Sequence, residues 1–126
     1  MAKNVVYSAE APEPIGPYSQ AIQSGNILFV SGQIAFQKSS GSLLTGNIQD
    51  ETHQVMKNLG EILKAASFDF PNVVKTSIFL KDMNNFSKVN EVYGSYFSAQ
   101  PPARETVEVS RLPKDVNVEI SCIAMR

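Results

Sequence analysis

Two charged side chains in the C-terminal part of the chain, Arg104 and Glu119, could carry out a simple hydrolysis together. An arginine binds a carboxylate through two parallel hydrogen bonds, a geometry that a lysine does not reproduce. A glutamate a few ångströms away can orient or deprotonate a water molecule. This pair would be sufficient to hydrolyse a small carboxylic acid that contains an already electrophilic bond, without a covalent nucleophile.

The two residues lie in segments that predict the last two strands of the chain. Strands over Arg104–Val109 and Asn117–Met125 flank a turn near Pro113, which predicts a hairpin. In such a hairpin the numbers of opposed residues sum to about 225, which places Thr106 opposite Glu119. With this parity the arginine and the glutamate share one face, and the valines of both strands face the helices.

Other chemistries are excluded because their residue types are rare. Cys122 is the single cysteine and His53 the single histidine, so disulfide frameworks, redox cysteine pairs and Cys/His zinc sites lack their residues. We expect Cys122 to fill space in a strand and His53 to be solvated on a helix surface. The sequence therefore argues against a metal site built from Cys and His, and it contains no glycine-rich phosphate-binding loop.

Charge and hydropathy narrow the range of partners. The chain has 11 Lys and Arg against 12 Asp and Glu, and its net charge is −1. This balance does not provide the basic surface to which nucleic acids and anionic membranes are attracted. No apolar run has the length of a signal peptide or a membrane span. We expect a cytoplasmic protein that binds neither membranes nor, as its main role, nucleic acid; a mature mitochondrial form stays open.

The hydropathy pattern predicts a single domain over residues 1–126 with the element order β-β-β-α-β-α-β-β. Before the last two strands, we expect strands at Val5–Tyr7, Ala21–Gln23, Ile27–Phe36 and Val73–Leu80 and a loop at Lys38–Gly46. The first helix spans Ile48–Ser67, with Glu51 among the polar residues of its outer face, and the second runs from Asn84 or Asn85 toward Pro101. Two amphipathic helices cover only one face of such a sheet, which predicts a two-layer α+β fold.

The sheet face left uncovered combines the predicted Arg104–Glu119 pair with the apolar Ile123 and Met125. Antiparallel sheets tolerate one solvated face, so this face could be an ordinary surface with a cross-strand ion pair. It could equally pack against other subunits, and the pair would then be partly desolvated in an inter-subunit cleft. The pattern alone leaves both possibilities open.

Several segments spread over the chain match the motifs of one protein family. The most specific is PARETVEVSRLPKD at Pro102–Asp115, which is continued by Val118–Ile120. Ile15–Gln20, Phe29–Gln33, Val74–Thr76 and Phe79–Asp82 follow the family's motifs in the same order. In these segments, which cover almost the whole chain, the sequence resembles the reactive intermediate deaminase family, also called the YjgF or endoribonuclease L-PSP family.

This resemblance implies a chorismate-mutase-like fold and a homotrimer, with the sheets packed into a central barrel and a pocket between subunits. It implies hydrolysis of 2-imino acids, such as 2-iminobutanoate and 2-iminopropanoate, to 2-oxo acids and ammonia without a cofactor. By the same resemblance Arg104 binds the substrate carboxylate and Glu119 lies beside the attacking water. The further binding residues that it implies are Tyr18, Ser31, Gly32, Asn90 and Thr106.

Two positions differ from the family's pattern. Glu105 follows the arginine where the family usually has a small residue, and Thr106 stands where many members have a cysteine. If alternation holds, Glu105 points away from Arg104 and forms a peripheral ion pair or distorts the strand. No thiol is present at position 106, which is consistent with simple attack by water.

The sequence is also compatible with two other functions. A non-catalytic trimer that binds small carboxylates, or acts as a chaperone, would use Arg104 but not Glu119. Ribonuclease activity or translation inhibition, which the family name suggests, is less expected. The lone His53, the balanced charge and the missing stripe of basic and aromatic residues argue against it.

Overall fold

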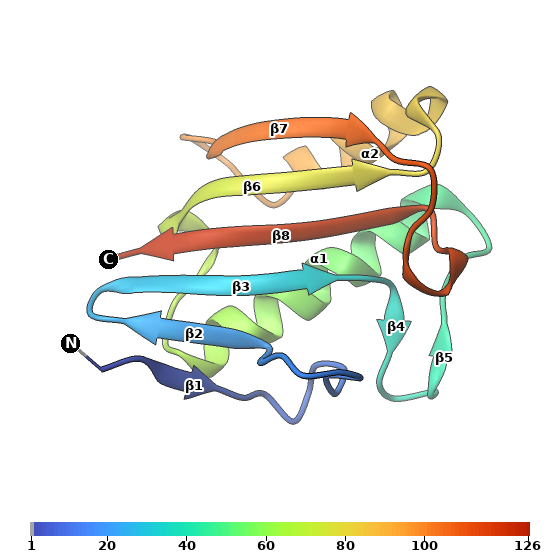
Figure 1. The fold of residues 1–126 in the computed structure, drawn as a ribbon. Helices are drawn as coiled ribbons and strands as arrows, with labels where there is room; N and C mark the ends of the chain where they lie inside the picture. The colour runs from blue at the N-terminus through green and yellow to red at the C-terminus, as the bar shows by residue number, and fades with distance from the viewer. Residues whose placement is uncertain (1) are drawn as a thin grey trace.

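Six strands form one sheet, and two helices pack on one of its faces (Figure 1). This computed structural model describes residues 2–126, so Met1 lies outside the described residues. The strands are β1 (Asn4–Val6), β2 (Ala21–Ser24), β3 (Ile27–Gln33), β4 (Phe36–Gln37), β5 (Ser42–Leu43), β6 (Val73–Leu80), β7 (Ala103–Glu108) and β8 (Val118–Met125). The helices are α1 (Ile48–Ala65) and α2 (Phe86–Gly94), with short 3₁₀ turns at η1 (Phe70–Asn72), η2 (Met83–Asn85) and η3 (Pro113–Asp115).

The predicted α+β class and the two amphipathic helices are confirmed, and most predicted elements lie within a few residues of their place. The strand predicted over Ile27–Phe36 is too long, because it ends at Gln33. The segment predicted as a loop at Lys38–Gly46 contains β5, which pairs with β4 in a small separate hairpin. Asn85 precedes α2 but caps it with no side-chain hydrogen bond, while Asp82 caps the preceding 3₁₀ turn.

The order of strands in the sheet is β1-β2-β3-β8-β6-β7. The predicted hairpin of the last two strands is therefore wrong, because β6 lies between β7 and β8. β7 pairs in parallel with β6, and β8 is antiparallel to both β3 and β6. The reason is that β6, α2 and β7 form a strand–helix–strand unit, and the helical crossover brings its two strands side by side in parallel.

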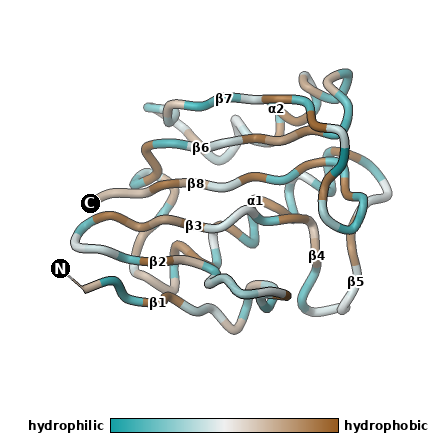
Figure 2. Tube along the Cα trace, viewed as in Figure 1, coloured by the Kyte–Doolittle hydropathy of each residue, from teal (hydrophilic) through white to brown (hydrophobic). Residues whose placement is uncertain are grey.

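The core lies between the sheet and helix α1. Alternate residues of the central strands, such as Leu28, Ile78 and Ile120, are fully buried and pack with the α1 residues Val55 and Leu59. Figure 2 shows hydrophobic residues recurring along β3, β8 and β6. This alternation fixes which residues of the central strands face the helices and which face the other way.

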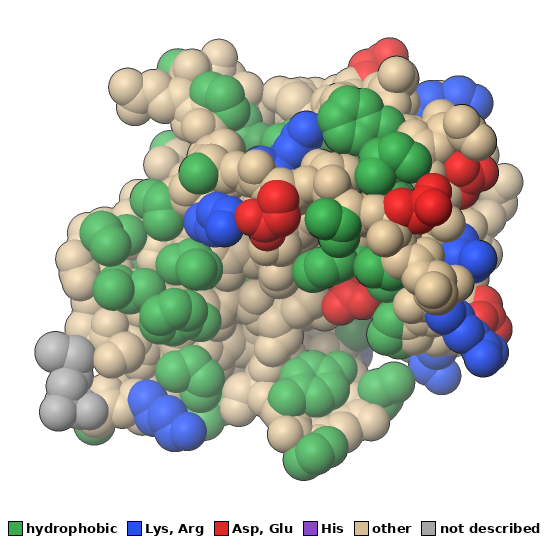
Figure 3. Space-filling view, turned by 45° about the horizontal axis from the view of Figure 1, so that its top comes forward, with side chains coloured by type: hydrophobic (Ala, Val, Ile, Leu, Met, Phe, Trp, Pro, Cys, Tyr) green, Lys and Arg blue, Asp and Glu red, His purple; other side chains and the backbone are tan. Residues whose placement is uncertain are grey.

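The other face of the sheet has no helix over it. It carries the remaining residues of the strands, and several large apolar side chains there are exposed: Phe29 by 45%, Val107 by 41% and Met125 by 43%. Figure 3 shows hydrophobic side chains gathered over the left part of this view, beside a pair of oppositely charged side chains, and most other charged groups at the right. We call this surface the open face.

Within residues 2–126, neither helix combines the length and the apolar character needed to cross a membrane.

Candidate functional site

Arg104 lies on the helix-covered face of the edge strand β7. It is opposite Thr76 of β6, whose buried hydroxyl is hydrogen-bonded to Tyr93 of α2. The guanidinium donates a hydrogen bond of 2.7 Å from Nη1 to Oδ1 of Asn90. Its Cζ atom lies 5.1 Å from the ring centroid of Tyr93 and 5.6 Å from that of Phe86, within the range of cation–π attraction.

Helix α2 therefore holds the guanidinium by one acceptor and two aromatic rings. Arginine has five N–H groups. Only one of them has a hydrogen-bond acceptor within residues 2–126. The others are available to an anion such as a carboxylate. Thr106, two residues further along the same face of β7, has a buried Oγ1 atom with no hydrogen-bond partner in the described chain.

Glu119 lies on the open face of β8, opposite Phe79 of β6. Its neighbours Val118 and Ile120 are fully buried on the helix side, and Glu119 itself is half-buried. Burial raises the pKa of its carboxyl above the ordinary glutamate value. Because the charged form is desolvated, this carboxylate is a stronger base than a solvated glutamate.

A bulge in β3 forms the wall beside Glu119. Val30 pairs with Cys122 and Gln33 pairs with Ile120, so two residues of β3, Ser31 and Gly32, stand against one residue of β8. A Cβ atom built on Gly32 would lie only 2.0 Å from Oε2 of Glu119. The absence of a side chain at Gly32 is thus what makes room for the carboxylate.

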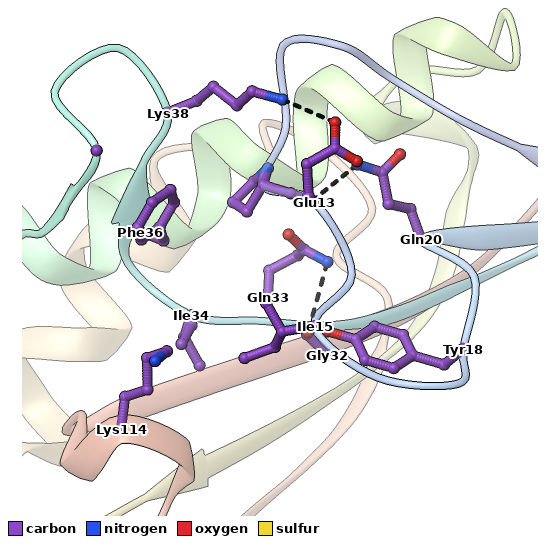
Figure 4. Close-up of a pocket in the computed structure, with 12 residues that line it drawn as sticks. Glu13, Ile15, Tyr18, Gln20, Gly32, Gln33, Ile34, Phe36, Lys38 and Lys114 are labelled. Carbon is purple, nitrogen blue, oxygen red and sulfur yellow. Dashed lines mark hydrogen bonds and ion pairs between the residues drawn. The ribbon is translucent and has the colours of Figure 1, made fainter.

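Ser31 connects this bulge to the proline-rich segment that carries Tyr18. The Ser31 hydroxyl donates a hydrogen bond of 2.6 Å to the carbonyl of Ser19, and its backbone N–H donates one of 2.9 Å to the carbonyl of Gln20. Tyr18 is about half exposed on the resulting loop. The loop, the bulge and β4 enclose a cavity of about 350 Å³ (Figure 4). Its lining includes Tyr18 and Gly32, with Pro12, Glu13, Ile15, Gln20, Gln33, Ile34, Phe36, Lys38, Gly41 and Lys114.

The predicted site residues thus fall into two groups. Arg104, Asn90 and Thr106 belong to β7 and α2, whereas Glu119, Gly32, Ser31 and Tyr18 surround the β3 bulge. The prediction that Arg104 and Glu119 share a face is wrong, because parallel pairing with β6 turns Arg104 and Thr106 toward the helices. In consequence Val107, predicted to face the helices, is exposed instead. Within one chain, Arg104 and Glu119 therefore lie on opposite faces of the sheet.

Glu105 points away from Arg104, as predicted, and lies on the open face. Its Oε1 is 2.9 Å from Nζ of Lys75, and its Oε2 accepts a hydrogen bond from the hydroxyl of Ser77. The hydrogen bond from Ser77, followed by the contact with Lys75, lowers the pKa of this carboxyl. Glu105 therefore forms an ion pair on the open face, on the side of β7 opposite to Arg104.

Glu51 was predicted to lie on the polar outer face of the first helix, and this prediction is wrong. Glu51 is fully buried, and its carboxylate accepts hydrogen bonds from three donors at the start of β8. These are the backbone N–H (2.7 Å) and side-chain amide (2.7 Å) of Asn117 and the backbone N–H of Val118 (3.3 Å). Its position four residues before the core residue Val55 was the available signal, because residues four apart share a helix face. Glu51 fixes the strand two residues before Glu119.

The remaining candidates have structural roles. Cys122 is buried, as expected, and desolvation raises the pKa of its thiol to about 12, so it stays protonated at neutral pH. His53 is only half exposed, and its Nδ1 lies 2.9 Å from the hydroxyl of Tyr96, so the prediction of a solvated histidine is wrong. No group of three or more His, Cys, Asp and Glu residues in the range 2–126 is arranged to hold a metal ion.

Comparisons with known proteins give a consistent result. Residues 8–126 match the family model described as Endoribonuclease L-PSP. A RutC family protein of Pyrococcus horikoshii is 52% identical over 124 residues, which cover 98% of both chains. A mouse protein named 2-iminobutanoate/2-iminopropanoate deaminase is 48% identical over 98% of this chain and 92% of its own. The crystal structure of a Rid family protein from Yersinia pestis superposes with a TM-score of 0.96 at 46% identity, covering 99% of this chain and 100% of that one.

Proposed function

The chain belongs to the endoribonuclease L-PSP (Rid) family, and on this premise we propose that it hydrolyses reactive 2-imino acids to 2-oxo acids and ammonia. The substrates that we propose are 2-iminobutanoate and 2-iminopropanoate, for which the mouse relative is named. The reaction consumes one water molecule and needs no cofactor.

The observation that carries this proposal is that each chain holds two complementary half-sites. One is a guanidinium with free N–H groups, held by Asn90 and the rings of α2. The other is a carboxylate of raised pKa against the Gly32 bulge. We propose a homotrimer in which Arg104 of one subunit and Glu119 of the next face the same pocket.

The open face supports this assembly. Phe29, Val107 and Met125 expose more than two fifths of their surface there, and Ile123 is half-buried among them. Large apolar side chains exposed together on one face are typical of interaction sites in proteins. A closed ring of identical chains would bury this face and form one pocket at each boundary between subunits.

In the proposed mechanism, Arg104 binds the substrate carboxylate through two parallel hydrogen bonds. Asn90 and the rings of Phe86 and Tyr93 keep the guanidinium in place, so that the imine carbon is presented to a water molecule at Glu119. The water oxygen bonds to the imine carbon as the C=N π bond breaks and its electron pair moves to the nitrogen, while Glu119 takes a proton from the water. Glu119 returns this proton to the nitrogen, and the C–N bond then breaks. The hydroxyl proton passes to the leaving nitrogen to give ammonia, and the carbonyl of the 2-oxo acid forms.

A coupled assay tests the activity. A threonine dehydratase supplies 2-iminobutanoate, semicarbazide traps the imine that remains, and the protein is expected to lower the yield of trapped product. Arg104→Ala and Glu119→Ala are each expected to abolish this effect. Absence of acceleration by the wild type, or full acceleration by Arg104→Ala, would overturn the proposal. Binding of 2-oxobutanoate without turnover would favour the non-catalytic carboxylate-binding module.

Mixed assembly tests the shared site. When Arg104→Ala and Glu119→Ala chains are unfolded together, refolded and assembled at random, about a quarter of the subunit boundaries regain both residues. We therefore expect about a quarter of wild-type activity from two variants that are inactive alone. An inactive mixture whose assembly is confirmed by light scattering would contradict the inter-subunit site.

A further inference from the structure

We infer that the cavity beside Glu119 receives the side chain of the substrate, and that the protein prefers 2-imino acids with large apolar side chains. This inference rests on the proposed function. The imine carbon carries three substituents: the nitrogen, the carboxylate and the side chain. If the carboxylate is held by Arg104 and water attacks from Glu119, the side chain needs a separate space. The described cavity borders Gly32, which is in contact distance of the Glu119 carboxylate.

The walls of this cavity are mostly apolar. Pro12, Ile15, Ile34 and Phe36 come from the proline-rich segment and from the end of β3 and the start of β4, and they line the cavity together (Figure 4). Ile15 is 69% exposed, so a ligand would remove its side chain from water.

The two glutamines in the lining are already engaged with the backbone. Gln20 accepts a hydrogen bond from the N–H of Ser8 at 2.7 Å and donates to the carbonyls of Ser8 (3.1 Å) and Pro12 (2.8 Å). Gln33 donates to the carbonyl of Ser31 at 3.2 Å. Their amides hold the loop and the bulge in shape, and a polar ligand group would have to compete with these bonds.

The charges at the rim do not favour an acidic side chain. Lys38 lies 3.2 Å from Glu13, which also accepts a hydrogen bond from the hydroxyl of Tyr7, so this cation is already paired. Lys114 lines the cavity from the other side but is exposed to solvent. The carboxylate of Glu119 repels a second anion on the substrate. The charges around the cavity therefore favour a substrate with a neutral side chain.

The volume of the cavity predicts the size of the substrate side chain. At about 350 Å³ the cavity has the size of a small-ligand pocket, and a methyl or ethyl side chain would leave most of it unfilled. Each methylene group buried from water improves binding by about fourfold. We expect kcat/KM for the leucine-derived imine, 2-imino-4-methylpentanoate, to exceed that for 2-iminopropanoate by at least about tenfold.

The imine substrates are made in the assay by an L-amino acid oxidase, with catalase present, from each amino acid and O₂. Leucine, alanine and glutamate give an apolar, a small and an acidic side chain, and semicarbazide trapping measures each rate. We expect Ile34→Trp, which narrows the cavity, to lower the leucine-to-alanine ratio of kcat/KM at least about tenfold. Ile15→Asp changes an exposed wall residue and is expected to lower the same ratio without a folding defect.

Lys57→Asp is the control, because Lys57 is exposed on helix α1, away from both the cavity and the open face, and the leucine-to-alanine ratio of this variant is expected to stay at the wild-type value. A wild-type ratio near one, a preference for the glutamate-derived imine, or unchanged ratios in both cavity variants would overturn this inference and leave the proposed function in place. Lack of activity on all three imines would overturn both.

Discussion

The carboxylate of Glu119 on β8 fills the place where a side chain at Gly32 of the neighbouring strand β3 would begin. A Cβ atom there would lie 2.0 Å from Oε2 and 2.9 Å from Cδ of the glutamate. The contact depends on the bulge in β3, which sets Gly32 against β8 with no side chain between them. The backbone of β3 thereby determines where the proposed base lies.

Gly32→Ala should inactivate the protein without unfolding it. The added methyl group forces the Glu119 carboxylate to move, and a displacement of about 1 Å in a catalytic group costs about 100-fold in rate. We expect kcat/KM to fall by about that factor while the melting temperature changes little. Gly46→Ala is the control, because a Cβ there would meet nothing within 4 Å. Wild-type activity in Gly32→Ala would show that the position of Glu119 does not limit the reaction.

The pH profile should report the raised pKa of Glu119. Burial favours the protonated carboxyl, and the proposed base works only when ionised. The acidic limb of kcat/KM should therefore lie above the ordinary glutamate value of 4.5, and Glu119→Gln should remove both the limb and most of the activity. A limb at or below the ordinary value would contradict this assignment.

The raised pKa of Glu119 also makes the stability of the fold depend on pH in one direction. Between the ordinary and the raised pKa the folded chain binds more protons than the unfolded chain, so stability decreases as the pH rises through this window. Glu119→Gln removes the ionisable carboxyl, so the variant does not lose stability in this way as the pH rises. Urea denaturation at several pH values should show the variant gaining stability relative to the wild type above the window and not below it.

Arg104→Lys should weaken ligand binding although it keeps the charge. A lysine lacks the paired N–H groups that match a carboxylate and the planar surface that packs between Phe86 and Tyr93. We expect the Kd for 2-oxobutanoate, measured by calorimetry, to rise about 100-fold. Arg126→Lys is a matched control, since Arg126 also stacks on a ring, that of Phe68, away from the site. Equal affinities of wild type and Arg104→Lys would exclude the bidentate anchor.

Glu51→Ala should destabilise the fold. It leaves three N–H groups of Asn117 and Val118 without their acceptor beneath the sheet, and unsatisfied buried donors are costly. The free energy of unfolding, from urea titration, should decrease by about 3 kcal/mol. Glu61→Ala, on the half-exposed side of the same helix, should change it by less than about 0.5 kcal/mol. Similar values for the two variants would mean that the buried carboxylate does not hold β8.

Cys122 should be chemically silent in the folded protein. Desolvation raises the pKa of its thiol to about 12, so the reactive thiolate is scarce at pH 8. We expect thiol reagents to label Cys122 only after unfolding, and Cys122→Ala to keep kcat/KM within about twofold of the wild type. Rapid labelling of the native protein would show that strand β8 opens to solvent and would contradict this prediction.

The amino-acid sequence by itself determined the elements and the chemical groups. The 3.6-residue repeat from Ile48 specified α1, the alternation over Val73–Leu80 specified β6, and Pro101 and Pro102 separated α2 from the next strand. The same local patterns identified Arg104 and Glu119 by type. Hydropathy also indicated a sheet covered by helices on one side only, and this is the observed fold.

Only the tertiary structure decided which strands are neighbours. Periodicity shows which residues of a strand share a face, but it does not name the strand that pairs with it. The insertion of β6 between β7 and β8 turned Arg104 toward α2 while Glu119 stayed on the open face. Burial of Glu51 and the contact of Gly32 with Glu119 likewise depend on segments far apart in the chain. Local sequence patterns do not contain such long-range contacts, because packing of the whole domain selects them.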